Sequence, residues 1–192
     1  MGSEYELKYR ADPESLSSIF TTFPARWQTI AMETTYYDTP SHSLSLRRWT
    51  LRRRMENNVS VCTLKTPGTG MERGEWEVKC DSIESAISEL CKLGAPQALT
   101  DLCNEGLVIS CGAKFTRRAA SFALRDAVME FALDQGVLLG GGKEIPLCEL
   151  EVEHKDGNRK SMETFAAELA GIYNLQPEEK SKFARALALC EE

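Results

Sequence analysis

Several features are scarce or absent in this sequence, and each absence excludes a class of protein. No apolar run approaches the length that is needed to span a membrane. The seven cysteines include no Cys-x-x-Cys pair, and their odd number disfavours a disulfide framework or a zinc site. The two histidines, His42 and His154, are too few and too isolated to suggest a pair of metal ligands. We therefore expect free thiols in a reducing cytoplasm and no membrane partner.

Basic residues are also fewer than acidic ones in this chain. The chain has 23 Lys and Arg against 29 Asp and Glu, and this net charge of -6 argues against a nucleic-acid partner. Its first residues do not combine a basic segment with an apolar run, so we expect a cytoplasmic rather than a secreted protein. A length of 192 residues and an apolar content of 42% suit one domain, residues 1–192, with a sizeable core. The oligomeric state stays open between monomer and homodimer.

The hydrophobic pattern predicts about eight strands, at 4–10, 29–37, 47–55, 59–66, 74–80, 113–124, 127–134 and 146–154. It predicts a helix that begins at Pro13, a second that Ser82 caps, and two more at 159–173 and 177–190, with a short helix and a loop in 95–112. Glu178 and Glu179 would then face solvent in the first turn of the last helix. Because the strands follow one another with few long crossovers, we expect an α+β fold. Its eight antiparallel strands would close into a barrel with helices packed on the outside.

Charged residues alternate with apolar ones along most of these strands. Since neighbouring side chains on a strand point to opposite faces, Glu4, Glu6 and Lys8 share one face of the first strand. Later strands repeat the pattern with Glu75 and Glu77, Glu130 and Asp134, Glu149, Glu151 and Glu153, Arg52 and Arg54, Lys65, and Arg117. Adjacent arginines at 53–54 and 117–118 break the alternation, so one of each pair must point outward.

One such strand would be typical of a sheet that packs one face on the core and exposes the other face to water. Here, however, Glu and Arg dominate the charged faces, and the acidic strands are distinct from the basic ones. If these faces turn inward, the barrel has an acidic wall and a basic wall, and like charges in a narrow space need counter-ions. A triphosphate with bound Mg²⁺ or Mn²⁺ would satisfy both walls at once.

Short motifs along nearly the whole chain also occur in a known order. They are E-Y-E-L-K at 4–8, Y-Y-D-T-P at 36–40, L-R-R-R at 51–54, T-L-K at 63–65 and E-L-E-V-E at 149–153. In this order they resemble the CYTH domain, or triphosphate tunnel metalloenzyme, family. F-T-R at 115–117, M-E-F-A-L-D-Q-G at 129–136, P-L-C-E-L-E at 146–151 and S-K-F-A-R at 181–185 are similar to its bacterial inorganic triphosphatase branch. Ala120 departs from that branch, where a tryptophan is frequent, but its parity places it on the outer face.

The resemblance implies an eight-stranded tunnel that binds a triphosphate and a divalent cation. It assigns metal binding to Glu4, Glu6, Glu130, Glu149 and Glu151. It assigns phosphate binding to Lys8, Arg52, Arg54, Lys65, Arg73, Arg117 and Lys182. In the predicted mechanism Lys8, Glu130 and Glu151 are the catalytic residues, and Glu75, Glu77, Asp134 and Glu153 complete the acidic lumen.

The function predicted on this basis is metal-dependent hydrolysis of a triphosphate, most of all inorganic triphosphate, with release of phosphate. Thiamine triphosphate and nucleoside triphosphates are alternative substrates. A class IV-type adenylyl cyclase would use the same tunnel to make cyclic AMP and pyrophosphate from ATP, with Tyr36, Tyr37 and Trp49 as candidates for stacking on the base. A non-catalytic polyphosphate-binding module is a further alternative, although pure binding would need mainly the cations.

Overall fold

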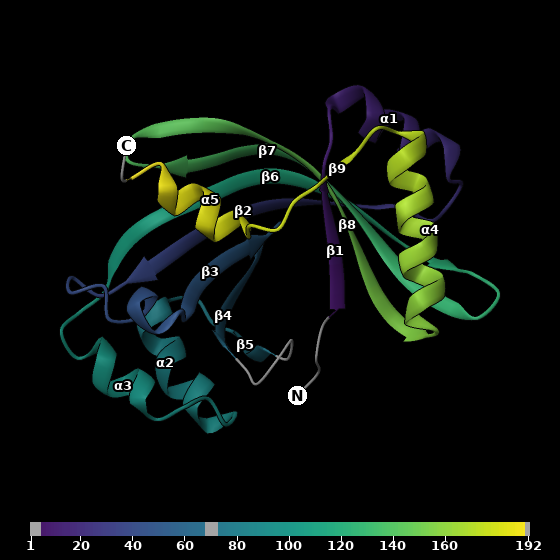
Figure 1. Ribbon diagram of the computed structural model, residues 1–192. Coiled ribbons are helices and arrows are strands. Elements are labelled where there is room, and N and C mark those ends of the chain that lie inside the picture. Colours follow the sequence, from purple (N-terminus) through teal and green to yellow (C-terminus); the bar gives the residue numbers. More distant parts are fainter. Residues whose placement is uncertain (1–4, 68–72, 191–192) are drawn as a thin grey trace.

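One strongly curved antiparallel sheet dominates the computed structural model, which describes residues 5–67 and 73–190 (Figure 1). Within these described residues the sheet has nine strands in the order β5-β4-β3-β2-β6-β7-β8-β1-β9. Their bounds are β1 (Tyr5–Arg10), β2 (Gln28–Asp38), β3 (Thr50–Glu56), β4 (Val59–Pro67), β5 (Arg73–Lys79), β6 (Val108–Ala123), β7 (Ala127–Gly140), β8 (Lys143–Gly157) and β9 (Gln176–Pro177). The predicted α+β class with an antiparallel sheet is confirmed; β5 and β9 end the hydrogen-bonded order of the described strands rather than pairing with each other.

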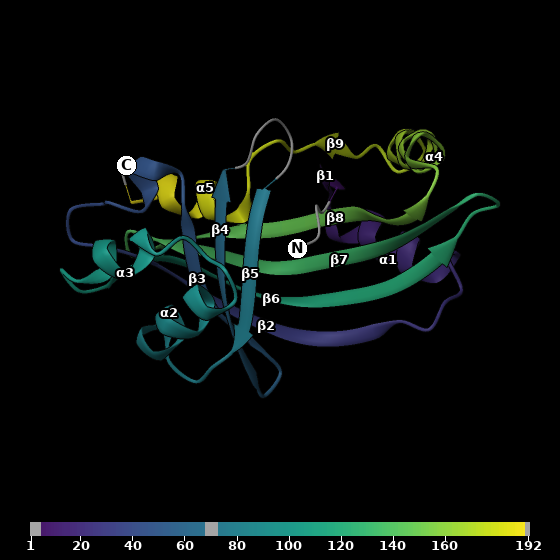
Figure 2. The same ribbon diagram turned by 90° about the horizontal axis from the view of Figure 1, so that it is seen from below.

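Helices α1, α2, α3 and α4 cover the convex face of this sheet (Figures 1 and 2). α1 (Pro13–Thr22) and α4 (Arg159–Ile172) lie over β7, β8 and β1, and α2 (Ile83–Lys92) and α3 (Ala98–Cys103) lie over β3–β5. Asp12, Ser82 and Asn158 cap three of them by accepting a hydrogen bond from a backbone N–H in the first turn. In the described ranges, none of the helices has the length and apolar character to cross a membrane.

The main core lies between the convex face and these helices. Phe131 of β7 and Leu150 and Val152 of β8 are fully buried there, against residues of α1 and α4 such as Ile19 and Met162. Each such side chain contributes about 1.5–3 kcal/mol when it leaves water. Because side chains alternate along a strand, burial of this set turns the charged residues between them toward the concave face.

The last helix, α5 (Lys182–Ala188), packs instead on the concave face, within the curve of the sheet (Figure 1). Phe183 and Leu187 contact a separate buried cluster that includes Met32, Ala113, Phe115 and Leu138. Gly140 makes this approach possible, because a side chain there would collide with the backbone carbonyl of Ala186. The helix therefore carries its first turn, with Lys182 and Arg185, into the charged part of the concave face.

The predicted boundaries of three elements were wrong by the most residues. β6 begins at Val108 rather than 113, because the long β2 pairs with it as far as Asp38. β7 continues to Gly140, six residues past the predicted end, and the turn that follows uses Gly141 and Gly142 at φ 57° and 74°. The last helix begins at Lys182 rather than 177, since residues 176–177 pair with β1 and extend the chain before Ser181 caps the helix.

Candidate functional site

Charged side chains of β1, β8, β7 and β6 gather on the concave face. Lys8 of β1 lies opposite Glu151 of β8, and Glu149 lies opposite Asp134 of β7, which in turn lies opposite Arg117 of β6. These cross-strand pairs bring side chains of one face to within about 5.5 Å at Cβ. The alternation in the sequence thus produces a continuous band of charge across four strands.

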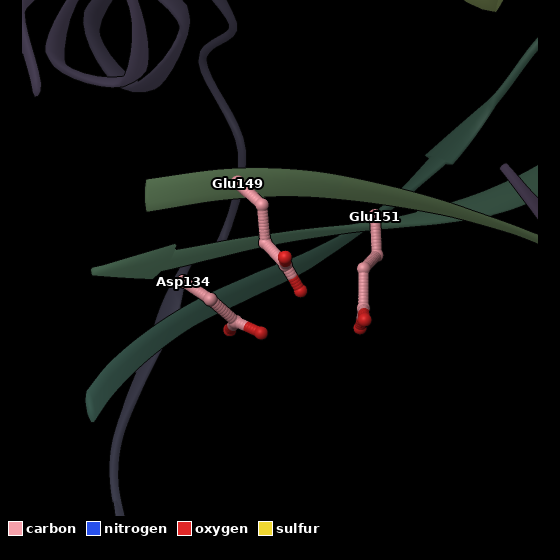
Figure 3. A group of neighbouring side chains, drawn as sticks. All are labelled: Asp134, Glu149 and Glu151. Carbon is pink, nitrogen blue, oxygen red and sulfur yellow. The ribbon is translucent and has the colours of Figure 1, made fainter. Parts of the chain in front are cut away.

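Three carboxylates converge in this band: Asp134 of β7 and Glu149 and Glu151 of β8 (Figure 3). One oxygen of each lies within 4.8 Å of the other two. The side chains of Asp134 and Glu149 have no exposed surface, and that of Glu151 is 13% exposed. Negative charges so close together and so far from water require cations beside them. We call these three residues the carboxylate cluster.

Arg117 and Lys182 bind the carboxylate cluster from two sides. Arg117 donates through Nε and Nη2 to the two oxygens of Asp134, at 2.8 and 2.7 Å, and through Nη2 to Glu151 at 2.6 Å. Lys182 Nζ lies 2.8 Å from Asp134 and 2.7 Å from Glu151, and it also contacts Glu149. Such charge-assisted, partly bidentate hydrogen bonds are the strong ones in proteins.

These contacts determine the protonation states of Glu151, Lys182 and Arg117. Burial alone would raise the pKa of Glu151, but the charges of Lys182 and Arg117 outweigh it and lower that pKa well below its usual range. Burial would likewise lower the pKa of Lys182 and of Arg117, yet the adjoining carboxylates outweigh it and raise both. Glu151, Lys182 and Arg117 are therefore all charged at neutral pH.

Arg185 is the third cation of the cluster, one helical turn after Lys182. Its Nη2 donates to Glu149, and its Nη1 lies 3.6 Å from Oε2 of Glu178. The expectation that Glu178 faces solvent in a helix was wrong: its side chain is 9% exposed, it precedes α5, and its N–H donates to the carbonyl of Lys8. Arg10 Nε lies 3.4 Å from the same carboxylate.

A basic wall faces the cluster from β3 and β4. It consists of Arg52, Arg54 and Lys65, which lie on the concave face with Tyr36 and Thr63 as cross-strand neighbours. Arg54 pairs with Glu56, and Lys65 Nζ lies 2.9 Å from Glu75.

The arginines of this wall have unused donors. In the part of the chain that the structure describes, the Nε atoms of Arg52 and Arg54 are buried without a hydrogen-bond partner. Burial and the charge of Arg52 lower the pKa of Arg54. Crowded guanidinium groups with spare donors favour an anionic ligand that has several oxygens.

The curvature brings the two walls within electrostatic reach, although they belong to opposite parts of the sheet order. Partial burial and the charge of Glu151 raise the pKa of Glu6 on β1, whereas Lys8 and Lys65 of β4 oppose that rise. The charge of Arg117 likewise contributes to the lowered pKa of Arg54. On the concave side of the sheet, carboxylates of β7 and β8 thus lie within electrostatic reach of cations of β3 and β4.

Some predicted site residues lie away from the carboxylate cluster. Glu130 precedes Asp134 by four residues on β7, which corresponds to about 13 Å along a strand. It lies beside Glu153, and Lys155 Nζ lies 2.7 Å from Glu153 and 3.9 Å from Glu130. Glu77 on β5 is exposed and accepts a hydrogen bond from Thr63 at 3.3 Å. Glu4 and the side chain of Arg73 lie outside the described residues.

The structure shows which arginine of the adjacent pairs 53–54 and 117–118 faces each side of the sheet. Arg53 donates to the hydroxyl of Ser60 at 2.9 Å on the convex face, and Arg118 stacks over the ring of Phe20 in α1 at 4.9 Å. Arg54 and Arg117 therefore face the concave side. Ala120 is buried at the convex face, which agrees with its parity.

Sequence reasoning missed two contributions to this site. Asp134 was placed only among the further lumen acids, yet it anchors both Arg117 and Lys182. Arg185 received no role, although its spacing of three residues from Lys182 puts both on one side of a helix and was a usable signal.

The carboxylate cluster has the chemistry to hold a divalent cation. Carboxylate oxygens are the ligands that Mg²⁺ and Mn²⁺ prefer, and the cluster offers one oxygen from each of three residues within 4.8 Å. Lys182 contacts all three carboxylates and so marks the position where positive charge is required. The residues present therefore fit a metal ion of this class.

Comparison with known proteins identifies the family of this chain and agrees with the fold. The sequence model of the CYTH domain family matches residues 2–187. The chain belongs to the CYTH family. A curated relative, an inorganic triphosphatase of Haemophilus influenzae, is 28% identical over 175 residues, which cover 88% of this chain and 50% of that protein. The chain thus spans about half the length of this CYTH relative.

Solved structures share the CYTH tunnel fold. A Hippeastrum protein, described as an adenylyl cyclase candidate with a dominant triphosphatase activity, has a TM-score of 0.71 at 16% identity; the match covers 97% of this chain and 96% of that one. A Bacillus halodurans adenylate cyclase candidate has a TM-score of 0.60 at 16% identity, over 95% and 96% of the two chains. PH1012 of Pyrococcus horikoshii has a TM-score of 0.56 at 20% identity, over 93% and 96%. At such identities the likeness concerns the fold alone.

Proposed function

We propose that this chain hydrolyses a triphosphate, with inorganic triphosphate as the leading candidate and Mg²⁺ or Mn²⁺ as the cofactor. The observation that carries the proposal is a buried carboxylate cluster facing arginines with unpartnered donors inside one curved sheet. The family and its curated triphosphatase relative support the same reading.

The basic residues would hold the substrate. Arg52 and Arg54 offer buried Nε donors to phosphate oxygens, and Lys65 and Lys8 extend the positive surface toward β4 and β1. Arg117 would join them while it stays anchored to Asp134. Phosphoryl transfer demands mainly positioning and stabilisation of charge, which a rigid set of cations supplies.

Asp134, Glu149 and Glu151 would hold the divalent ion, and Glu6 lies close enough to Glu151 to influence it electrostatically. When bound, such an ion offsets charge on the phosphate oxygens and assists the activation of water. Because Lys182 contacts all three carboxylates in the free protein, we expect its ammonium group to turn toward phosphate oxygens when the cluster binds metal.

In the proposed reaction the oxygen of a water molecule bonds to a terminal phosphorus. The bond from that phosphorus to its bridging oxygen breaks, so triphosphate and water become diphosphate and phosphate, and the protons of the water pass to product oxygens or to solvent. Glu151 is held in its charged form by Lys182 and Arg117 and therefore suits a role in charge stabilisation more than one in accepting a proton. Glu130, the residue predicted to orient the water, lies about 13 Å along β7 from Asp134, so it could do so only at a phosphate held away from the carboxylate cluster.

The structure disfavours the specific base contacts considered for a cyclase. Tyr36 is 3% exposed and packs against Phe183 with ring centres 5.0 Å apart. Tyr37 and Trp49 pack into the cluster beneath α2 and α3 on the convex face. These three aromatic side chains are occupied in packing, which favours hydrolysis over recognition of an adenine base.

The deciding experiment is phosphate release from inorganic triphosphate, ATP and thiamine triphosphate, each with Mg²⁺ or Mn²⁺, while cyclic AMP is measured in the ATP samples. We expect phosphate from inorganic triphosphate and a loss of at least about a hundredfold in Glu149→Gln. Glu144→Gln, an exposed position on the same strand, is the matched control. Tight triphosphate binding without turnover would instead identify a binding module, and cyclic AMP would identify a cyclase.

A further inference from the structure

Arg185 differs from the other two cations of the carboxylate cluster in what it contacts. Arg117 reaches Asp134 and Glu151, and Lys182 reaches all three carboxylates. Within the cluster Arg185 contacts Glu149, and its other ion pair is with Glu178, outside the cluster. Its side chain is only 13% exposed, so the ion pair with Glu149 is largely shielded from water and from salt.

The charges of the carboxylate cluster and of the cations that contact it balance. Asp134, Glu149 and Glu151 supply three negative charges, and Arg117, Lys182 and Arg185 supply three positive ones. The adjoining Arg10–Glu178 pair adds no net charge. A divalent cation that enters this balanced cluster has to displace or outcompete positive charge already bound to its ligands.

We propose that Arg185 is a positioning residue that sets the affinity of the carboxylate cluster for divalent cations by holding Glu149 in a buried ion pair. This inference rests on the proposed function of the cluster as a metal site. Arg185 acts through Glu149 and is not itself expected to touch the substrate. Its removal would leave these charges with a net of -1 and would free Oε2 of Glu149 for a metal ion, while Oε1 keeps its contact with Lys182.

The test is a titration of the purified chain with Mn²⁺ in the absence of triphosphate, with free Mn²⁺ followed by electron paramagnetic resonance. We expect Arg185→Gln to bind Mn²⁺ about tenfold more tightly than the parent, because one close positive charge is lost from a shielded site. Arg185→Lys keeps the charge and should bind Mn²⁺ like the parent. Arg118→Gln loses the same charge from the convex face and should also leave the affinity unchanged.

A second variant tests the inference by removing Glu178, the ion-pair partner of Arg185 outside the cluster. Glu178→Gln removes the competing carboxylate, so Arg185 interacts more strongly with Glu149 and Mn²⁺ binding should weaken about threefold. Glu179→Gln, at the exposed neighbouring position, is the matched control for this charge change. If Arg185→Gln does not fold, this pair decides: equal Mn²⁺ affinity in Glu178→Gln and Glu179→Gln overturns the inference.

For a folded Arg185→Gln variant, Mn²⁺ binding equal to or weaker than that of the parent overturns the inference. Triphosphate hydrolysis by the parent is measured separately, so the two proposals can fail independently. Hydrolysis by the parent together with unchanged Mn²⁺ affinity in the variants refutes the role of Arg185 alone. The expected Mn²⁺ affinities without turnover of any triphosphate support that role and refute the proposed function.

Discussion

Asp134→Asn is the substitution that tests the architecture of the site most directly. It keeps the shape of a fully buried side chain but removes the negative charge of the carboxylate. The two oxygens of this carboxylate accept hydrogen bonds from Arg117 at 2.8 and 2.7 Å. In either orientation, the NH2 group of the new amide would face a cation, because Arg117 contacts both oxygens and Lys182 lies 2.8 Å from Oδ2. Two buried cations would thus lose a shared partner without gaining access to water.

The size of the effect follows from the remaining contacts. Removal of one partner from a buried ion pair costs about 3–5 kcal/mol. Arg117 keeps Glu151, and Lys182 keeps Glu149 and Glu151, so we expect the lower end of that range, about 3 kcal/mol. For a chain of this length that corresponds to a fall in melting temperature of about 9 °C.

The measurement is urea unfolding followed by circular dichroism in metal-free buffer, with Asp156→Asn as a control at an exposed position of β8. Metal-free inorganic triphosphate should then stabilise Asp134→Asn more than the parent, because its oxygens replace the missing anion beside Arg117 and Lys182. An unfolding free energy within about 0.5 kcal/mol of the parent would refute the reasoning, since surface substitutions produce changes of that size.

Three further predictions concern other parts of the molecule. Arg54→Ala should raise the KM for triphosphate at least about tenfold, while the adjacent Arg53→Ala, on the convex face, should not; equal KM values would contradict the assignment of faces. The N–H and hydroxyl of Ser15 lower the pKa of Asp12, so Asp12 contributes stability above pH 3.8 that is lost as the pH falls through its lower folded value; an NMR titration midpoint at or above 3.8 would contradict this. Burial raises the pKa of Cys111 to about 12, so in the native protein iodoacetamide should modify the exposed Cys190 well before Cys111, and mass spectrometry of the labelled peptides will show the order.

Much of the fold was predictable because it depends on local patterns. The alternation of Glu6 and Lys8 with Tyr5 and Leu7 predicts a two-faced strand, and Asp12 before Pro13 predicts the start of a helix. The predicted boundaries were wrong where pairing with another strand decides where an element begins or ends. Residues 176–177 are extended because they pair with β1, whereas the sequence pattern alone placed the start of the last helix at 177.

The candidate site was predictable in its residue types more than in its pairings. The sequence placed acids and bases on one face, and the structure gathers Glu149 and Glu151 with Lys182. Glu130 and Asp134 lie on the same face of β7, but only Asp134 lies opposite Glu149 of β8. The register between the two strands decides which of these carboxylates contact each other. Arg185 joins that row through a helix whose docking depends on Gly140, some forty residues earlier in the chain.

The sequence by itself determined which residues carry charge, which face of each strand they occupy, and the family to which the chain belongs. Only the tertiary structure decided that Asp134 anchors Arg117, that α5 docks inside the curve of the sheet, and that Lys182 and Arg185 neutralise the carboxylate cluster. The physical reason is that alternation is a property of the local backbone. Contact between charges depends on strand register, sheet curvature and the packing of a distant helix, and a local pattern encodes none of these.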